Sequence, residues 1–233
     1  MSQDRYLIWD FDGTLAIRPG EWTATVCEVV SGRHPDLAVE PERIRPHLRS
    51  GFPWHTPERL CGSRSHDEWW DGIYPVLERA MVEGAGVEPV DARALARELR
   101  AVYTASHHWK VYEDTIPVLQ ALRESGWRHL MLSNHVPELS RLVADLGLHG
   151  YFTAIFCSAD IGVEKPHPQA FERVFAAYPA AREGWMIGDS WTADVCGADR
   201  VGLRSILVRR AHPAATLRCE TLHEVVPLLA GSR

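Results

Sequence analysis

The sequence predicts an α/β protein in which a doubly wound parallel sheet is interrupted by an inserted α-helical cap. Short apolar runs of strand length recur at residues 6–10, 128–133, 152–157, 185–188 and 203–208. From about residue 112 onward, segments with helical spacing lie between these runs, as in a parallel sheet with crossover helices. Because this alternation stops between residues 16 and 110, we expect a core of residues 1–15 and 111–233 and a helical cap of residues 16–110.

The helices of the core are predicted from caps, apolar spacing and stop signals. Asp114 or Thr115 can cap a helix that Gly126 can end. Apolar residues one helical turn apart indicate further helices over residues 139–146 and 171–178. Short helices are also expected over residues 192–199 and 222–229. Pro227 disfavours a regular helix in the last of these segments.

The inserted segment is predicted to contain three helices, around residues 22–30, 69–80 and 95–102, with no clear strand between them. Trp69 and Trp70 open a helix with apolar spacing behind them, so we expect both in the core of the cap. A segment of this length needs a small core of its own. Because the insertion directly follows a turn that carries Asp10 and Asp12, we expect it to cover that turn as a lid.

Composition excludes several classes of protein. The 233 residues carry a net charge of −6, which argues against a general nucleic-acid binder. No apolar run reaches the roughly 18 residues of a membrane span, and the first residues show no signal peptide. The 5 cysteines form no CxxC pair and the 12 histidines show no zinc-ligand spacing, which favours a cytoplasmic protein. The oligomeric state stays open.

The segment Asp10-Phe11-Asp12-Gly13-Thr14-Leu15 directly follows the first predicted strand. Two carboxylates two residues apart repel each other unless a cation or a proton separates them. Strand ends of parallel sheets are also where α/β proteins build their sites. The alternative is a solvated turn with no chemical role.

The ends of the other strands carry polar residues that could meet at the same edge of the sheet: Ser133-Asn134, then Glu164-Lys165-Pro166, then Gly188-Asp189 with Asp194 beyond it. Lys165 is one of two lysines, since 23 of the 25 basic residues are arginine. Carboxylates suit Mg²⁺, and a lysine with small polar donors suits the oxygens of a phosphoryl group. An aspartate can attack phosphorus and form an aspartyl phosphate.

This ordered set of motifs resembles the haloacid dehalogenase superfamily over residues 6–208. The resemblance implies a Rossmann-like catalytic core with a cap that sets substrate specificity. It implies that Asp10 is the nucleophile and an Mg²⁺ ligand. It further implies that Asp12 is the general acid and base, with its backbone carbonyl on the metal, and that Lys165 neutralises the nucleophile and the phosphate.

The resemblance also assigns the remaining polar residues. Thr14 would orient Asp12 or the phosphoryl group, Ser133 and Asn134 would hold phosphoryl oxygens, and Asp189 would ligate Mg²⁺. Asp194 would support Lys165 or a metal-bound water. Each has a plainer alternative: Ser133 and Asn134 could cap a helix near residue 136, Asp194 could be an exposed charge, and Thr14 a turn residue. His135 could face substrate, cap a helix or lie on the surface.

Within this resemblance, the sequence favours an Mg²⁺-dependent phosphatase acting on small phosphate monoesters. Dehalogenases of the superfamily usually lack an aspartate at the position of Asp12. Phosphonate hydrolases need a cap lysine, and residues 16–109 contain none. A phosphosugar mutase, a 2-haloacid dehalogenase and a non-catalytic binding protein on the same fold stay as alternatives. In the cap, Arg49 could bind a second anionic group and Trp54 could stack on substrate, or Trp54 could anchor the cap core.

Overall fold

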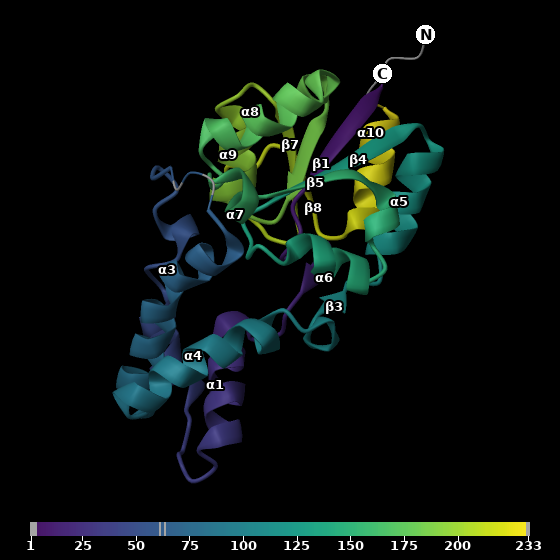
Figure 1. The fold of residues 1–233 in the computed structure, drawn as a ribbon. Coiled ribbons are helices and arrows are strands. Elements are labelled where there is room, and N and C mark those ends of the chain that lie inside the picture. The colour runs from purple at the N-terminus through teal and green to yellow at the C-terminus, as the bar shows by residue number, and fades with distance from the viewer. Residues whose placement is uncertain (1–3, 61, 63, 232–233) are drawn as a thin grey trace. The chain divides into compact units, whose positions relative to one another are not determined.

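The computed structural model describes residues 4–60, 62 and 64–231. Its contacts divide the chain into two compact units. The first, here called the sheet unit, comprises Met1–Ile17, Leu60–Ser63 and Val111–Arg233, and the second, the helical unit, comprises Arg18–Arg59 and Arg64–Lys110. Figure 1 shows the strands gathered in the first unit and long helices in the second.

Six parallel strands form the sheet, in the order β5-β4-β1-β6-β7-β8. Their bounds are β1 Arg5–Trp9, β4 Trp127–Ser133, β5 Phe152–Cys157, β6 Trp185–Gly188, β7 Arg204–Val208 and β8 Arg218–Cys219. The five predicted strands are confirmed. β1 lies between β4 and β6, so the strand order reverses there. Sites of α/β proteins are found at the carboxyl ends of the strands beside such a reversal.

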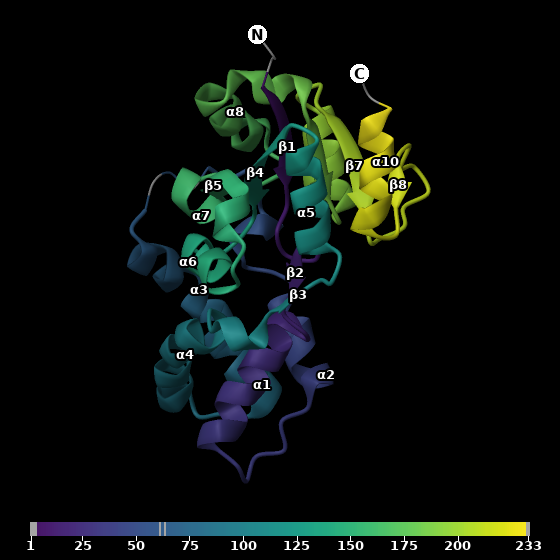
Figure 2. The same cartoon turned by 90° about the vertical axis from the view of Figure 1, so that its right-hand side faces the viewer.

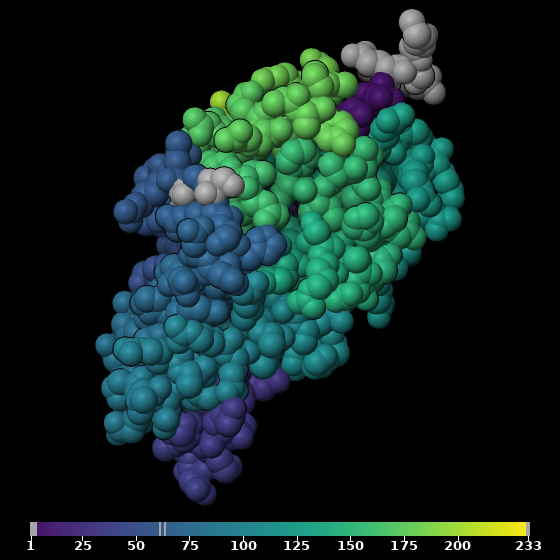
Figure 3. Space-filling model, in the orientation of Figure 1, coloured from purple at the N-terminus to yellow at the C-terminus, as the bar shows by residue number. Residues whose placement is uncertain are grey.

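Helices cover both faces of this sheet (Figures 1 and 2). The described helices of the sheet unit are α5 Thr115–Glu124, α6 Leu139–Asp145, α7 Ser158–Ile161, α8 Pro168–Ala177, α9 Cys196–Asp199 and α10 Val225–Ala230. On one face, Phe171 and Val174 of α8 pack on Ile8 and Leu130 in a fully buried cluster. In Figure 3 the green atoms of this part of the chain form much of the visible surface of the sheet unit. α5 and α10 lie on the opposite face.

Two predicted core helices are less regular than expected. The segment expected over 192–199 is a π-helical turn, Trp191–Val195, followed by α9. The segment expected over 222–229 begins as a 3₁₀ turn, Leu222–Glu224, before α10, in which Pro227 lies near the start. Proline is tolerated in a first helical turn, which explains why the helix forms despite it.

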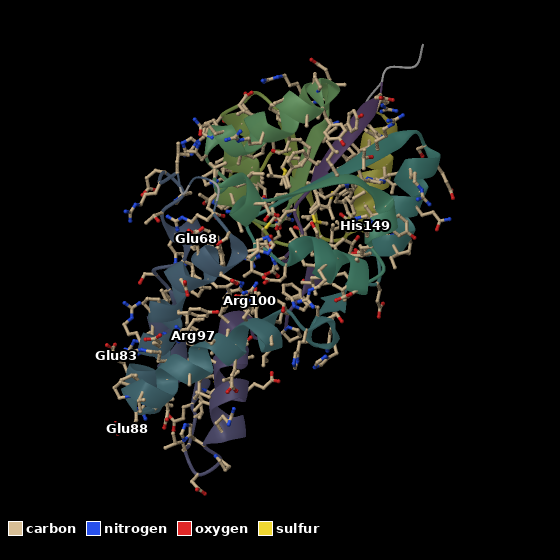
Figure 4. The ribbon with its side chains drawn as sticks, in the orientation of Figure 1. Glu68, Glu83, Glu88, Arg97, Arg100 and His149 are labelled. Atoms are coloured by element: carbon tan, nitrogen blue, oxygen red, sulfur yellow. The ribbon has the colours of Figure 1, made fainter. Side chains whose placement is uncertain are left out.

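The helical unit contains α1 Glu21–Arg33, α2 Pro41–Ile44, α3 His66–Arg79 and α4 Pro89–Tyr103. A capping box begins α3: Ser65 Oγ accepts the Glu68 N–H, and the Glu68 carboxylate (Figure 4) accepts the Ser65 N–H. Short helical turns of this unit lie at Arg45–Leu48, Pro53–His55, Ala80–Gly84 and Ser106–His108. Those of the sheet unit lie at His149–Tyr151 and Pro179–Glu183.

Aromatic side chains form the core of the helical unit. Trp22 stacks on Tyr103 with ring centroids 3.8 Å apart, and Phe52 packs against Trp22 at 4.8 Å. Trp69 and Trp70 are buried, which confirms the expectation that both belong to this core. The strands β2 Ala16–Ile17 and β3 Lys110–Val111 pair where the chain leaves the sheet unit and returns to it. No helix among the described residues is long and apolar enough to span a membrane.

Candidate active site

Three adjacent strands of the sheet place acidic and polar side chains at one edge. Asp10 directly follows β1, Ser133 ends β4 and Asp189 directly follows β6. Because β4, β1 and β6 are neighbours and parallel, these three residues meet at their carboxyl ends. The Asp10 N–H donates to the Ile187 carbonyl at 2.9 Å, so the sheet pairing continues into the first residue of the site.

The Asp10 carboxylate is buried and accepts three hydrogen bonds. Its Oδ1 accepts from Ser133 Oγ at 2.9 Å and from Lys165 Nζ at 2.8 Å. Its Oδ2 accepts from Thr14 Oγ1 at 3.2 Å. Donors on both oxygens fix the orientation of the carboxylate. Thr14 therefore contacts Asp10 directly and is more than a turn residue.

Lys165 is a buried cation between two carboxylates. Its Nζ lies 2.8 Å from Asp10 Oδ1 and 2.6 Å from Asp194 Oδ1. Burial alone would lower the pKa of this ammonium, but Asp10 and Asp194 outweigh burial and raise its pKa above the ordinary value. Lys165 therefore stays charged at neutral pH. Asp194 is itself buried, so the alternative that it is an exposed charge is wrong.

Asn134 holds the main chain of Lys165. Its Nδ2 donates to the Lys165 carbonyl at 2.8 Å, and its Oδ1 accepts the Lys165 N–H at 2.7 Å. The alternative that Ser133 and Asn134 cap the following helix is wrong, because α6 begins at Leu139 with Glu138 in the cap position. An amide nitrogen carries two hydrogens, so a further bond from Asn134 to a phosphoryl oxygen is compatible with this geometry and stays a prediction.

The donor set fits a divalent cation bound by oxygen ligands. Asp10, Asp189 and Asp194 each offer a carboxylate oxygen within 4.8 Å of the others, and all three are buried. Burial, followed by the charges of Asp10 and Asp194, raises the pKa of Asp189 to about 7. Burial likewise raises the pKa of Asp194 to about 6. Clustered carboxylates with raised pKa values indicate a place where a hard cation would relieve repulsion.

Two glycines leave room for these carboxylates. Gly13 has a φ of +80°, and a Cβ at this position would lie 2.5 Å from Asp189 Oδ2. A Cβ on Gly188 would lie 2.1 Å from Asp194 Oδ2. The acidic cluster therefore depends on the absence of side chains at both positions.

Asp12 lies in the tight loop that follows Asp10 and is half-buried. The Gly13 N–H donates to the Ala16 carbonyl at 2.8 Å, and the Leu15 N–H donates to the Phe11 carbonyl at 2.9 Å. These bonds fold the segment back on itself and hold Asp12 two residues beyond the carboxylate of Asp10. This segment is therefore an ordered loop at the edge of the sheet.

The remaining sequence candidates are Arg49, Trp54 and His135. Arg49 and Trp54 belong to the helical unit, where Arg49 is exposed and Trp54 stacks on Phe52 at 4.8 Å. Their contact with substrate stays a prediction. His135 is buried, which excludes a surface role, and burial lowers its pKa to about 4.

Two arginines at the end of β7 were missed by the sequence analysis. Arg210 Nε lies 2.7 Å from Asp189 Oδ2. Arg209 Nε donates to the Thr14 carbonyl at 2.7 Å, and its Nη2 donates to Asp114 Oδ1 at 2.6 Å. Both directly follow the last predicted strand, so the strand-end rule that selected Asp10 and Asp189 could have selected them as well.

Fold and site together define a class: α/β enzymes with an aspartate at the end of a central parallel strand, beside a buried lysine and further aspartates. A family model described as haloacid dehalogenase-like hydrolase matches residues 5–202. The chain therefore belongs to the haloacid dehalogenase-like hydrolases, as the sequence resemblance implied.

Similar proteins include haloacid dehalogenase-like hydrolase domain-containing protein 3 of Mus musculus, 29% identical over 221 residues, which are 91% of this chain and 84% of that protein. Phosphoserine phosphatase of Thermus thermophilus is 32% identical over 146 residues, 60% of this chain and 57% of that enzyme. A solved Bacillus subtilis hydrolase with bound magnesium has a TM-score of 0.76 at 19% identity, covering 98% of this chain and 100% of that one. This likeness shows the shared fold.

Proposed function

We propose that this protein is an Mg²⁺-dependent phosphatase that hydrolyses small phosphate monoesters through an aspartyl phosphate on Asp10. The observation that carries the proposal is the Asp10 carboxylate, which Ser133, Lys165 and Thr14 hold beside two further buried aspartates. Relatives named as phosphatases support it: phosphoserine phosphatase of Thermus thermophilus, phosphoglycolate phosphatase of Aquifex aeolicus and glyceraldehyde 3-phosphate phosphatase of Methanopyrus kandleri.

In the first step, a carboxylate oxygen of Asp10 attacks phosphorus while the bond from phosphorus to the ester oxygen breaks. Asp12, protonated, gives its proton to the leaving oxygen, and the alcohol departs. In the second step, Asp12 takes a proton from water, and that water attacks the phosphorus of the aspartyl phosphate. The bond between the Asp10 oxygen and phosphorus breaks, inorganic phosphate leaves, and both aspartates return to their starting states.

The remaining residues supply positive charge or fix the position of Lys165. Lys165 carries a positive charge next to Asp10 and offsets negative charge on the phosphoryl oxygens. Asp194 keeps Lys165 in place, and Asn134 fixes its main chain. Mg²⁺, held by Asp10, Asp189 and the main-chain carbonyl of Asp12, would supply further positive charge to the phosphoryl group.

The test is phosphate release from p-nitrophenyl phosphate and from a panel of small phosphate monoesters, with Mg²⁺ and with a chelator. We expect turnover only with Mg²⁺. The Asp10→Asn variant should lose roughly 10⁴-fold in kcat, because the amide is not a nucleophile. Glu138→Gln, a change of a carboxylate outside the acidic cluster, is the control and should keep its activity.

Other results separate the alternative functions. Full activity of the Asp10→Asn variant would mean that the nucleophile is misassigned. Return of the phosphoryl group to a sugar, without free phosphate, would identify a mutase. Chloride release from 2-chloropropionate without metal would identify a dehalogenase. Binding without turnover of any panel member would favour a non-catalytic protein.

A further inference from the structure

Arg210 forms an ion pair with Asp189, one of the three aspartates of the acidic cluster. Its Nε lies 2.7 Å from Asp189 Oδ2, and both residues belong to the sheet unit. The Asp189 side chain is 7% exposed, whereas the Arg210 side chain is 65% exposed. The aspartate is therefore part of the buried site, while the arginine reaches it from solvent and can turn back into water without becoming a buried unpaired cation.

The main chain on both sides of Arg210 is anchored beside the cluster. Arg209, the residue before it, has a φ of +62°, which is uncommon for a residue with a Cβ, and donates to the Thr14 carbonyl at 2.7 Å. Two residues after Arg210, His212 stacks on Trp191 with ring centroids 4.1 Å apart and ring planes 8° apart. These contacts hold the segment against the loops that follow β1 and β6, and a strained main chain of this kind is typical of functional segments.

The cations of the cluster divide its three carboxylates between them. Asp10, Asp189 and Asp194 each offer an oxygen within 4.8 Å of the others. Lys165 pairs with Asp10 and Asp194, and Arg210 pairs with Asp189. A divalent ion on Asp189 would bring two further positive charges next to Arg210, and like charges at such short range repel each other. The pairing of Arg210 and the binding of a metal ion therefore oppose each other.

The oxygen that Arg210 contacts lies on the side of the loop after β1. A Cβ on Gly13 would lie 2.5 Å from the same Asp189 Oδ2. Asp12, whose main-chain carbonyl is a ligand of the proposed metal site, directly precedes Gly13. Arg210 therefore occupies the side of the Asp189 carboxylate that faces this loop.

We propose that Arg210 competes with Mg²⁺ for Asp189 and thereby sets the affinity of the site for the metal. Without the metal, Arg210 pairs with Asp189 and limits the repulsion within the cluster. When the metal binds, the guanidinium gives up Asp189 and turns into solvent. The inference rests on the metal site of the proposed function and adds how its occupancy is controlled.

The test is isothermal titration calorimetry of the whole chain, freed of metal with a chelator and titrated with MgCl₂ at constant ionic strength. We expect the Kd for Mg²⁺ to fall about tenfold in Arg210→Gln, because a positive charge next to the metal is removed. Arg210→Lys keeps the charge and should stay within about threefold of wild type. Arg173→Gln is the matched control, because Arg173 is an exposed arginine on α8 of the same unit, and its Kd should equal that of wild type.

Nuclear magnetic resonance observes the displacement in the wild-type protein. The Arg210 Nε–H signal is identified by its absence from the spectra of Arg210→Gln and Arg210→Lys, so one folded variant is enough. Saturating Mg²⁺ should shift this signal to the position of solvent-exposed arginines and speed its exchange with water, because the hydrogen bond to Asp189 is lost. Choline chloride at the same ionic strength should leave the signal where it is, which separates displacement from screening.

The outcomes separate failure of this inference from failure of the proposed function. Equal or weaker Mg²⁺ binding by Arg210→Gln, or an Arg210 signal that Mg²⁺ leaves unchanged, would overturn the competition alone. No Mg²⁺ binding by any of these proteins would overturn both the competition and the Mg²⁺ dependence of the proposed function. Tighter binding by Arg210→Gln, in a protein that releases phosphate from no ester, would support the competition and contradict the phosphatase proposal.

Discussion

Lys165 shows how one residue can serve both the stability and the chemistry of a site. Its ammonium is buried between Asp10 and Asp194 and hydrogen-bonded to both. A compact ammonium on a slim stem fits between two carboxylates, whereas arginine ends in a broader planar fork. In a chain with 23 arginines, a lysine here is therefore explained by shape as well as by charge.

His129 is a second buried titratable residue, on the opposite face of the sheet from α8. Its Nδ1 accepts the indole N–H of Trp9 at 2.9 Å, and its Nε2 donates to the Leu119 carbonyl at 2.9 Å. This pattern requires the neutral ring. Burial lowers the pKa of His129 to about 4.

We expect His129 to make stability depend on pH. As the pH falls, the unfolded side chain, with a pKa near 6.5, binds a proton before the folded side chain does. The stabilising contribution of the neutral His129 ring is therefore present above about pH 6.5 and is lost as the pH falls toward 4. Between pH 7 and pH 5 the loss should be roughly 2 kcal/mol. Urea unfolding at both pH values checks this. The decrease in the free energy of unfolding between pH 7 and pH 5 should be smaller by roughly 2 kcal/mol in His129→Gln. It should be unchanged in His149→Gln, a substitution of an exposed histidine (Figure 4).

At the scale of elements, Arg209 joins segments that are far apart in the chain. It donates to the Thr14 carbonyl, pairs with Asp114 at the start of α5 and lies 3.6 Å over the Tyr112 ring. Asp114 also accepts the Leu222 N–H at 2.8 Å. One cluster thus ties the loop after β1 to α5, the end of β7 and the C-terminal segment.

Replacing Arg209 with Met should lower the free energy of unfolding by about 2 to 4 kcal/mol, because Asp114 would stay largely buried without its cation. Arg218→Met, which removes an exposed arginine, should change stability by less than about 0.5 kcal/mol. Urea unfolding followed by circular dichroism compares the two variants. A loss below about 1 kcal/mol for Arg209→Met would show that the cluster contributes little.

Elements with a long repeating pattern were predictable, and those set by tertiary pairing were not. The apolar run of β1 predicts a strand, and the spaced apolar residues of α8 predict a helix, without any knowledge of the neighbouring elements. β2, β3 and β8 have two residues each and show no period; they exist because a neighbouring strand pairs with them. The π-helical turn after β6 was also missed, because five residues are too few for their spacing to distinguish a π-helical turn from an α-helical turn.

At the scale of the whole molecule, Mg²⁺ should stabilise the folded chain. A ligand that binds only the folded state at about 100 times its Kd adds roughly 2.7 kcal/mol. We expect Mg²⁺ to raise the unfolding temperature of wild type but not of Asp189→Asn, which removes one charge from the cluster of three aspartates. Asp199→Asn, a change of an exposed aspartate on α9, should respond like wild type. An unchanged response in Asp189→Asn would contradict the proposed metal site.

Residues of the candidate site could be selected from the sequence, but the hydrogen bonds between their side chains could not. Asp10, Ser133 and Asp189 could be selected because each follows or ends a strand of one parallel sheet. The bond of Thr14 to Asp10 and the hold of Asn134 on Lys165 depend on side-chain geometry between loops, which spacing does not encode.

The near absence of lysine has a practical consequence for labelling. Lys165 is buried and ion-paired, whereas Lys110 is exposed at the start of β3. An amine-reactive dye therefore has a single accessible lysine side chain, at the point where the chain returns from the helical unit to the sheet unit. A fluorophore attached there would mark the junction of the two units in the chain.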